Sequence, residues 1–155
     1  MRTLLSVLLL SLFLTFMQGC SNCRCVDGTL GFSFKGYQPS DLSIITLKRY
    51  AKETGFNQLL DSTRFFIDTD FRLRQQDDIL RFGIRPGNML LAPNADWEIV
   101  LPSAARTIRI QDIKSPQVKD DCSGKVQCVN PILSALVNGV IVHLTPGNPD
   151  ILLSK

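Results

Sequence analysis

The chain has 155 residues, of which 17 are Lys or Arg and 14 are Asp or Glu, so its net charge is +3. This length is enough for one ordinary domain with its own core. The basic residues are scattered and most alternate with apolar neighbours, which is typical of a solvated strand face and argues against a nucleic-acid partner. No internal repeat, low-complexity tract or charge block divides the chain.

The first residues predict an export signal. One basic residue, Arg2, precedes an apolar run at residues 4–17 that three hydroxyl residues interrupt. Such a run is typical of a signal peptide. It is fourteen residues long, shorter than the roughly 20 that a helix needs to cross a bilayer, and no basic stop-transfer cluster follows it. We therefore expect residues 1–19 to be a signal peptide that is removed, and not a permanent anchor.

The apolar run ends in Met17-Gln18-Gly19-Cys20, which resembles the lipobox of bacterial lipoproteins. The resemblance implies cleavage before Cys20, a diacylglyceryl group on its sulfur and an acyl group on the new amino terminus, and two such chains hold a protein stably on a membrane. Ser21 stands where aspartate would resemble an inner-membrane retention signal, and no acidic run resembles a surface-export signal. The expected location is therefore the cell envelope, on the periplasmic face of an outer membrane. The alternative is an ordinary secretory signal, with Cys20 left as a thiol.

The remaining cysteines fit an oxidising compartment. If Cys20 carries lipid, four are left, Cys23, Cys25, Cys122 and Cys128, and an even number favours disulfides. A bridge from Cys23 to Cys25 would be strained, because a single residue separates them. We therefore expect each of these two to pair with Cys122 or Cys128, in an order that stays open. A zinc site of four thiolates is the alternative, although neither spacing is the usual C-x2-C. No cofactor is expected.

Alternation of apolar and polar residues dominates the rest of the chain and predicts half-buried strands. Trp97, Ile99 and Leu101, for example, alternate with Glu98 and Val100. Turn signals rich in Pro, Gly and Asn separate the alternating segments. The other alternating segments are residues 30–35, 79–85 and 107–111.

These segments predict an all-β fold. About seven or eight short strands without a convincing helix indicate an antiparallel β-sandwich over residues 28–155, after a short lipidated tether at 20–27. The succession of strand, proline turn and strand at 97–113 resembles the immunoglobulin-like or transthyretin-like domains of exported bacterial proteins. That resemblance is one of pattern and implies no functional residue.

Residues 42–54 are ambiguous between helix and strand. Pro39-Ser40-Asp41 could begin a helix and Gly55 could end one. The apolar residues of the segment scatter around a helical wheel, however, and Ile44, Ile45 and Thr46 are β-branched. The segment is therefore interpreted as a strand, with a helix left open.

Asn138-Gly139 between two apolar segments predicts a β-hairpin with a two-residue type I′ turn. Such a turn fixes the register, so one face of the hairpin is wholly apolar and is expected to belong to the core. Ser134 and His143 face each other on the opposite side. The expected apolar pairs are Val137 with Val140, Ala135 with Val142, and Leu133 with Leu144.

Two pairs of residues are candidate contact sites. Phe65 and Phe66 are adjacent, so in a strand one of them must face away from the other and out of the core. Ser134 and His143 lie opposite each other, as a nucleophile and its base would. Catalysis also needs an orienting carboxylate and an oxyanion hole, which a flat strand pair does not supply. The pair is therefore interpreted as a surface contact, and no catalytic residue is predicted.

Aspartates in predicted turns are the candidate metal ligands. Asp68, Asp70, Asp77 and Asp78 could hold calcium, but the distal glutamate of a calcium loop is missing. They are interpreted as turn and strand-end caps, and no metal site is predicted.

The leading functional hypothesis is a non-enzymatic envelope lipoprotein, held on the membrane by its N-terminal lipid, that binds a protein or glycan or serves as an accessory subunit. One alternative is an envelope hydrolase that uses Ser134 and His143 or a pair of acids. Another is a carrier of a small ligand or metal, which predicts that the four cysteines are reduced.

Overall fold

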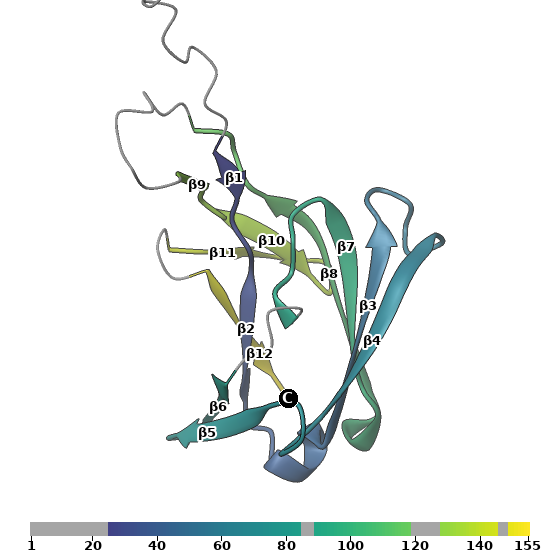
Figure 1. The fold of residues 1–155 in the computed structure, drawn as a ribbon, viewed down its shortest axis with the longest axis vertical. Coiled ribbons are helices and arrows are strands. Elements are labelled where there is room, and N and C mark those ends of the chain that lie inside the picture. The colour runs from purple at the N-terminus through teal and green to yellow at the C-terminus, as the bar shows by residue number, and fades with distance from the viewer. Residues whose placement is uncertain (1–24, 85–88, 119–127, 146–148) are drawn as a thin grey trace, which may run out of the picture.

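The computed structural model describes residues 25–84, 89–118, 128–145 and 149–155 (Figure 1). The expected signal peptide, the lipidation site at Cys20 and two of the expected disulfide cysteines, Cys23 and Cys122, lie outside the described residues. Within these ranges no helix has the length and apolar character needed to cross a membrane.

The described residues form twelve strands, two short 3-10 helices and no α-helix. The 3-10 helices are η1 (Pro39–Leu42) and η3 (Pro102–Ala104). The strands are β1 (Val26–Asp27), β2 (Gly31–Lys35), β3 (Ile44–Ala51), β4 (Leu59–Phe66), β5 (Arg72–Gln76), β6 (Ile79–Ile84), β7 (Ala95–Leu101), β8 (Arg106–Lys114), β9 (Val129–Asn130), β10 (Ser134–Val137), β11 (Val140–His143) and β12 (Asp150–Ser154).

The strands form two large sheets and one small one. A six-stranded antiparallel sheet has the order β11-β10-β8-β7-β3-β4, and a four-stranded sheet has the order β12-β2-β6-β5. In the small sheet β1 pairs with β9. The expected all-β class is confirmed, and Val26 and Asp27, which were assigned to the tether, already belong to a strand.

Two details of the expected architecture are wrong. The strand count is twelve within the described residues, because the two-residue strands β1 and β9 are too short to show alternation and β4 has no alternation of apolar and polar residues. The sheets are also not purely antiparallel, since β12 runs parallel to β2 and β1 runs parallel to β9. Alternation reports which face a residue occupies and not the direction of the neighbouring strand, so it could not reveal this.

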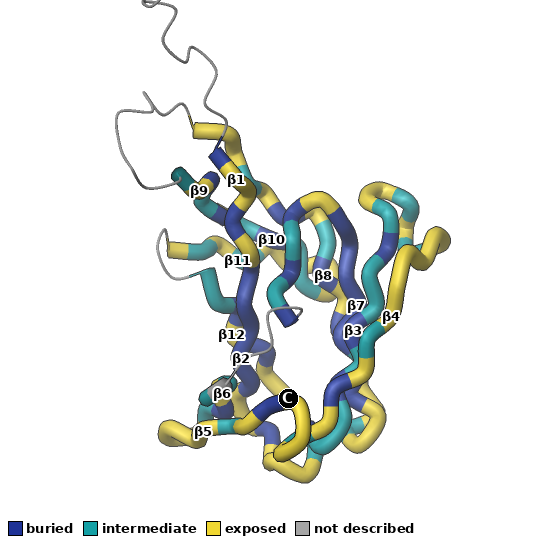
Figure 2. Tube along the Cα trace, viewed as in Figure 1, coloured by how far each residue is buried: buried dark blue, intermediate teal, exposed yellow. Residues whose placement is uncertain are grey.

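One apolar cluster contains residues of both large sheets (Figure 2). Phe32 and Phe34 contribute from the four-stranded sheet, and Leu47, Ile99 and Ile110 contribute from the six-stranded sheet. Burial of each such side chain stabilises the fold by roughly 1.5–3 kcal/mol. The apolar positions of the alternating segments at 30–35, 97–101 and 107–111 thus face the core as expected.

The ambiguous segment at 42–54 is a strand. Ile45 and Leu47 on β3 are buried, and Thr46 between them is half-buried. Pro39-Ser40-Asp41 does begin a helix, but only the single 3-10 turn η1, which ends at Leu42. Strand pairing with β4 and β7 on both sides decides the conformation of the segment.

The hairpin of β10 and β11 has the predicted register, with Val137 opposite Val140 and Ser134 opposite His143. Asn138 and Gly139 have positive φ values of 47° and 83°, as a type I′ turn requires. The prediction that its apolar face is core is only partly right, because Ala135 is buried whereas Val140 is 65% exposed. Strand β11 lies at the edge of the six-stranded sheet, and among the described strands only β10 pairs with it.

Candidate functional site

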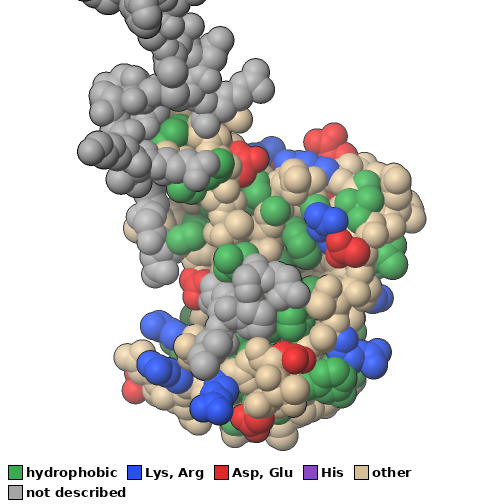
Figure 3. Space-filling model, in the orientation of Figure 1, with side chains coloured by type: hydrophobic (Ala, Val, Ile, Leu, Met, Phe, Trp, Pro, Cys, Tyr) green, Lys and Arg blue, Asp and Glu red, His purple; other side chains and the backbone are tan. Residues whose placement is uncertain are grey.

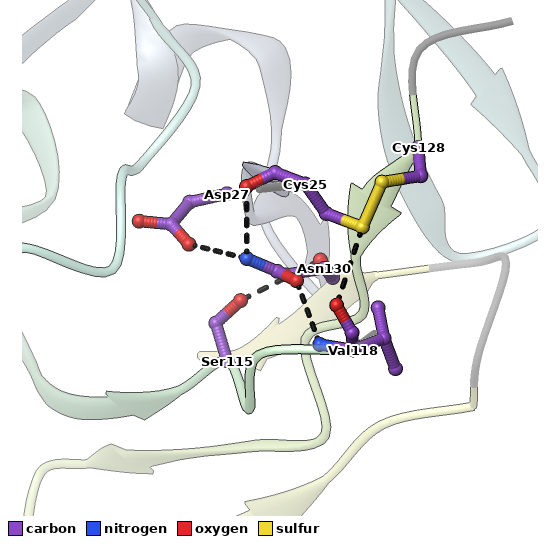
Figure 4. Close-up of a disulfide and its surroundings, with 6 residues drawn as sticks. All are labelled: Cys25, Asp27, Ser115, Val118, Cys128 and Asn130. Atoms are coloured by element: carbon purple, nitrogen blue, oxygen red, sulfur yellow. Dashed lines mark hydrogen bonds between the residues drawn. A yellow bond between two sulfur atoms is a disulfide. The ribbon is translucent and has the colours of Figure 1, made fainter. Parts of the chain in front are cut away.

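A disulfide joins Cys25 to Cys128, with their Cα atoms 4.8 Å apart (Figure 4). It connects one cysteine of the first expected pair with one of the second. Beside it Asn130 is fully buried, and its Nδ2 donates hydrogen bonds to the Cys25 carbonyl and to Asp27 Oδ1, at 3.3 and 2.9 Å. Its Oδ1 accepts a hydrogen bond from the Val118 backbone N–H at 3.0 Å. The disulfide and Asn130 therefore fix the first described residues to the body of the domain.

The predicted contact residues do not form one site. They are Phe65, Phe66, Ser134 and His143. Phe65 is buried and Phe66 is 43% exposed, so one of the pair faces outward as expected. Phe66 is on β4, whereas Ser134 and His143 are on β10 and β11 at the opposite side of the same sheet. His143 is exposed, and none of the described carboxylates forms a hydrogen bond or ion pair with its imidazole.

Two of the aspartates in the candidate calcium turns have partners within the protein. Asp70 Oδ2 accepts a hydrogen bond from the Phe66 backbone N–H at 2.8 Å, and Asp78 lies 3.6 Å from Lys35 Nζ. In the described part of the chain no three His, Cys, Asp or Glu residues lie close enough together to hold a metal ion.

The outer face of the six-stranded sheet carries a polar cluster that the sequence did not reveal. At its centre is Glu98 on β7, a residue that is only 6% exposed. The strand register places Lys48 of β3 and Arg109 of β8 directly opposite Glu98, one on each side. Tyr50 follows on the same face of β3. Three strands therefore bring one carboxylate, one phenol and two cationic side chains together.

Every partner of Glu98 stabilises its charged form. Tyr50 Oη donates a hydrogen bond to Oε2 at 2.9 Å, Arg109 Nε donates one to Oε1 at 2.9 Å, and Lys48 Nζ lies 3.7 Å from Oε2. Burial alone would raise the pKa of Glu98, but these hydrogen bonds and positive charges outweigh it and hold the pKa below its usual value. Burial and the neighbouring Glu98 carboxylate raise the pKa of Tyr50. At neutral pH the site therefore contains an ionised glutamate and a neutral tyrosine.

Phe56, in the loop between β3 and β4, covers one end of this cluster. Its φ is +64°, a conformation that is uncommon for a bulky side chain and costs of the order of 1–3 kcal/mol. Its ring packs edge-on against Tyr50 with centroids 5.3 Å apart, and Arg109 Cζ lies 4.9 Å from the ring centroid. The Glu98 carboxylate and the Phe56 ring together orient the Arg109 guanidinium.

Arg109 lines an open hollow of about 420 Å³. The hollow lies between the β3–β4 loop, which contributes Phe56, and the β10–β11 turn at Asn138 and Gly139. The Arg109 side chain is 59% exposed, and Glu98 is its only ion-pair partner among the described residues. The arrangement is a pre-oriented cation at the edge of a solvent-filled depression, which suits recognition of an acceptor group on another molecule. The remaining lining residue is Gln111.

An exposed apolar residue, Ile141, lies next to this hollow. Ile141 is 64% exposed and follows the turn that lines the hollow, whereas the neighbouring Val140 is opposite Val137 on the other face of the sheet. Ile141 is opposite Leu136, which is itself opposite Gln111, so these three side chains share the outer face. We call Arg109, Gln111, Asn138 and Ile141 the hairpin surface.

A larger hollow, of about 550 Å³, lies elsewhere and has its cations engaged. Lys52 Nζ donates a hydrogen bond to the Pro93 carbonyl at 3.1 Å, and Lys114 forms an ion pair with Asp112. The two lysines of this larger hollow are therefore less available to a ligand than Arg109 of the hairpin surface.

Comparison with known proteins adds no family. No protein family, curated protein or solved structure matches the chain.

Sequence reasoning assigned Glu98 and Arg109 to a solvated face and missed that they meet. The turn at Pro102-Ser103 was recognised, and pairing of the strands on either side of it would have placed Glu98 opposite Arg109. No signal in the sequence indicates that Phe56 adopts a left-handed conformation, since glycine and asparagine are the usual residues there.

Proposed function

We propose that the chain is a lipid-anchored protein of the bacterial cell envelope that binds a partner protein through the hairpin surface. Its β-rich domain is, in this proposal, a sandwich of the immunoglobulin-like or transthyretin-like kind. The lipobox-like Met17-Gln18-Gly19-Cys20 supports the anchor, and the outer membrane facing the periplasm is the proposed location. The first described strand, β1, begins at Val26, so a lipid on Cys20 would hold the domain close to the membrane.

One observation carries the binding proposal. The buried Glu98 carboxylate orients Arg109 into an exposed hollow, beside the apolar side chain of Ile141, which is 64% exposed. Protein interfaces are enriched in arginine and in apolar residues that lose their exposure on binding. An exposed edge strand is also able to pair with a strand of another chain.

Capture of partners from solubilised membranes tests the binding proposal. The full-length lipoprotein is crosslinked in cells and purified, in wild-type form and with Arg109→Ala or Arg109→Lys. We expect a defined protein partner with the wild type and its loss with Arg109→Ala. Arg109→Lys should reduce capture, because lysine keeps the charge but lacks the planar guanidinium that donates two parallel hydrogen bonds. Arg106→Ala is the matched control, since Arg106 is an exposed arginine on the same strand and lies opposite Leu101.

Two outcomes would contradict the proposal. Equal capture by wild type and Arg109→Ala, with both proteins unfolding at the same temperature, would exclude the hairpin surface as the contact. The anchor has its own test, because Cys20→Ala should move the protein from the membrane fraction to the soluble fraction. If it stays with the membrane, the lipid on Cys20 is not the anchor.

A further inference from the structure

Three arginines share the outer face of the β5–β6 hairpin, far from the hairpin surface. Arg74 is directly opposite Arg81, and Arg72 is two residues from Arg74 on β5. All three are exposed, and none forms an ion pair or a side-chain hydrogen bond with another described residue. We call Arg72, Arg74 and Arg81 the arginine face.

The two opposed arginines oppose folding. Like charges directly across an antiparallel pair repel each other and destabilise the sheet. Two acids lie near these arginines, Asp78, which is paired with Lys35, and Asp150, which accepts a hydrogen bond from Ser33, and neither forms an ion pair with the three arginines. A charge arrangement that costs stability without a partner in the domain is expected where a ligand supplies the opposite charge.

Gly83 leaves room for the Arg74 side chain to lie against the sheet. It is the extra residue of a bulge in β6, where the register shifts between Arg72 and Leu73. A Cβ atom on Gly83 would lie 2.9 Å from Arg74 Cγ and 3.0 Å from Arg74 Nε. Because Gly83 has no side chain, the aliphatic part of the Arg74 side chain can occupy the space beside it. A glycine inside a strand weakens it, so this geometry also has a cost in stability.

The three arginines lie on the side of the hairpin that faces away from the core. Leu73 and Phe82 of the same strand pair point the other way and pack against the core. Adjacent arginines on one strand face are separated by about 7 Å, and opposed ones by about 5 Å. Interfaces with folded proteins are centred on buried apolar side chains, whereas a row of exposed guanidinium groups suits repeated oxyanions.

The position of the face fits a ligand away from the anchor. Strands β5 and β6 lie at the opposite end of the long axis from β1, where the chain enters the domain (Figure 1). Basic side chains gather over these two strands in the lower left of Figure 3. A lipid at the N-terminus would therefore place the arginine face on the side of the domain that points away from the membrane.

We propose that the arginine face binds an anionic glycan polymer of the envelope through its carboxylate or phosphate groups. The guanidinium groups of Arg72, Arg74 and Arg81 donate hydrogen bonds to successive oxyanions along the polymer. This site is separate from the hairpin surface and goes beyond the function proposed above. The two sites together would link a membrane-anchored protein to a partner protein and to a polymer.

Binding of the full-length lipoprotein in detergent to immobilised polymers tests this. Polygalacturonate supplies carboxylates, polyphosphate supplies phosphates, and dextran is the neutral control. We expect binding to at least one anionic polymer and not to dextran, with affinity that falls as salt rises from about 50 to 300 mM because the charges are screened. Which polymer binds more tightly identifies the oxyanion.

The variant Arg74→Gln/Arg81→Gln should weaken polymer binding by about tenfold or more, because it removes two charge-assisted contacts. Its Tm should not fall, since a repulsive pair is removed. The matched control Arg64→Gln/Arg106→Gln removes the same charge from exposed arginines on β4 and β8 and should change binding by less than about twofold.

Two results would overturn the proposal. One is the absence of salt-dependent binding to both anionic polymers, and the other is an equal loss of binding in the two double variants, which would indicate a net-charge effect. Arg109→Ala should leave polymer binding unchanged, so failure of the hairpin surface and failure of the arginine face are distinguishable.

Discussion

Glu98 is a buried carboxylate on a sheet face that alternation assigns to solvent. Its side chain is 8% exposed and touches the cations of Lys48 and Arg109 and the phenol of Tyr50. A buried charge is tolerated only when it is paired and hydrogen-bonded, and removal of one partner leaves it costly. The partners of Glu98 are therefore the residues at which single substitutions have the clearest effect.

Tyr50→Phe tests the hydrogen bond to Glu98. The substitution removes one hydroxyl and leaves the ring in place against Phe56, so we expect the free energy of unfolding to fall by about 1 kcal/mol. Urea denaturation measures this. Tyr37→Phe is the control, because the buried Tyr37 hydroxyl has no hydrogen-bond partner within the described residues and its loss should not destabilise the protein. A smaller effect of Tyr50→Phe than of Tyr37→Phe would contradict the assignment.

The lowered pKa of Glu98 predicts acid sensitivity. A carboxyl whose pKa is lower in the folded state contributes stability above its unfolded pKa, and this stability is lost as the pH falls through the folded value. The loss should therefore begin below about pH 4.5, the ordinary value for the group. Thermal unfolding between about pH 3 and 7 should show a shallower acid decline in Glu98→Gln than in wild type. Identical declines in the two proteins would contradict the predicted shift.

At the scale of elements, the residues of the turns determined how much of the strand pairing the sequence could predict. Asn138-Gly139 fixed the register of β10 and β11 residue by residue, because few other residues fit a type I′ turn. Alternation likewise identified the inward residues of β7. It could not predict β4, which is exposed along most of its length and does not alternate, or the parallel pairing of β12 with β2.

The polar cluster was missed for a related reason. Its residues come from β3, β7 and β8, and only the lateral order of these strands brings them together. Periodicity assigned Glu98 and Arg109 to the correct face but not to each other. Strand order depends on contacts far apart in the chain, which a pattern within one segment does not contain.

Gly139→Ala tests the hairpin turn. Gly139 has a φ of 83°, and a Cβ there meets no neighbouring atom, so the cost is one of backbone strain alone. We expect the free energy of unfolding to fall by about 1 kcal/mol in urea denaturation. Val140→Ala, at the adjacent residue that is 65% exposed, should change it by no more than about 0.5 kcal/mol. Equal costs for the two substitutions would argue against the type I′ geometry.

At the scale of the whole molecule, the disulfide closes most of the domain into one loop. Cys25 and Cys128 are 103 residues apart in the sequence. The first residues of the domain are held by this bond and by the hydrogen bonds of Asn130. A pulling force from an anchor at the N-terminus would therefore act first on the small sheet of β1 and β9.

Removal of the disulfide should destabilise the protein substantially. For Cys25→Ser/Cys128→Ser we expect the free energy of unfolding to fall by about 2–5 kcal/mol. The disulfide restricts the conformational entropy of the unfolded chain, and its removal restores that entropy. Urea denaturation without reductant compares the variant with the wild type. An unchanged unfolding midpoint would mean that the two cysteines are not bridged in the native protein.

In the proposed function, the domain has two separate binding faces and one anchored end. The hairpin surface lies on the six-stranded sheet and the arginine face on the four-stranded sheet. Substitutions at one face should therefore leave binding at the other unchanged, since effects at distant sites with no shared partners are usually independent.

The most direct test of the proposed function is photo-crosslinking in intact cells from position 141. A photoreactive amino acid in place of Ile141 should give a discrete adduct with one protein in the membrane fraction, and Arg109→Ala should abolish it. The same residue in place of Leu60, which is 49% exposed on the opposite edge of the sheet, should give no such adduct. No adduct from position 141, or the same adduct from both positions, would contradict the account.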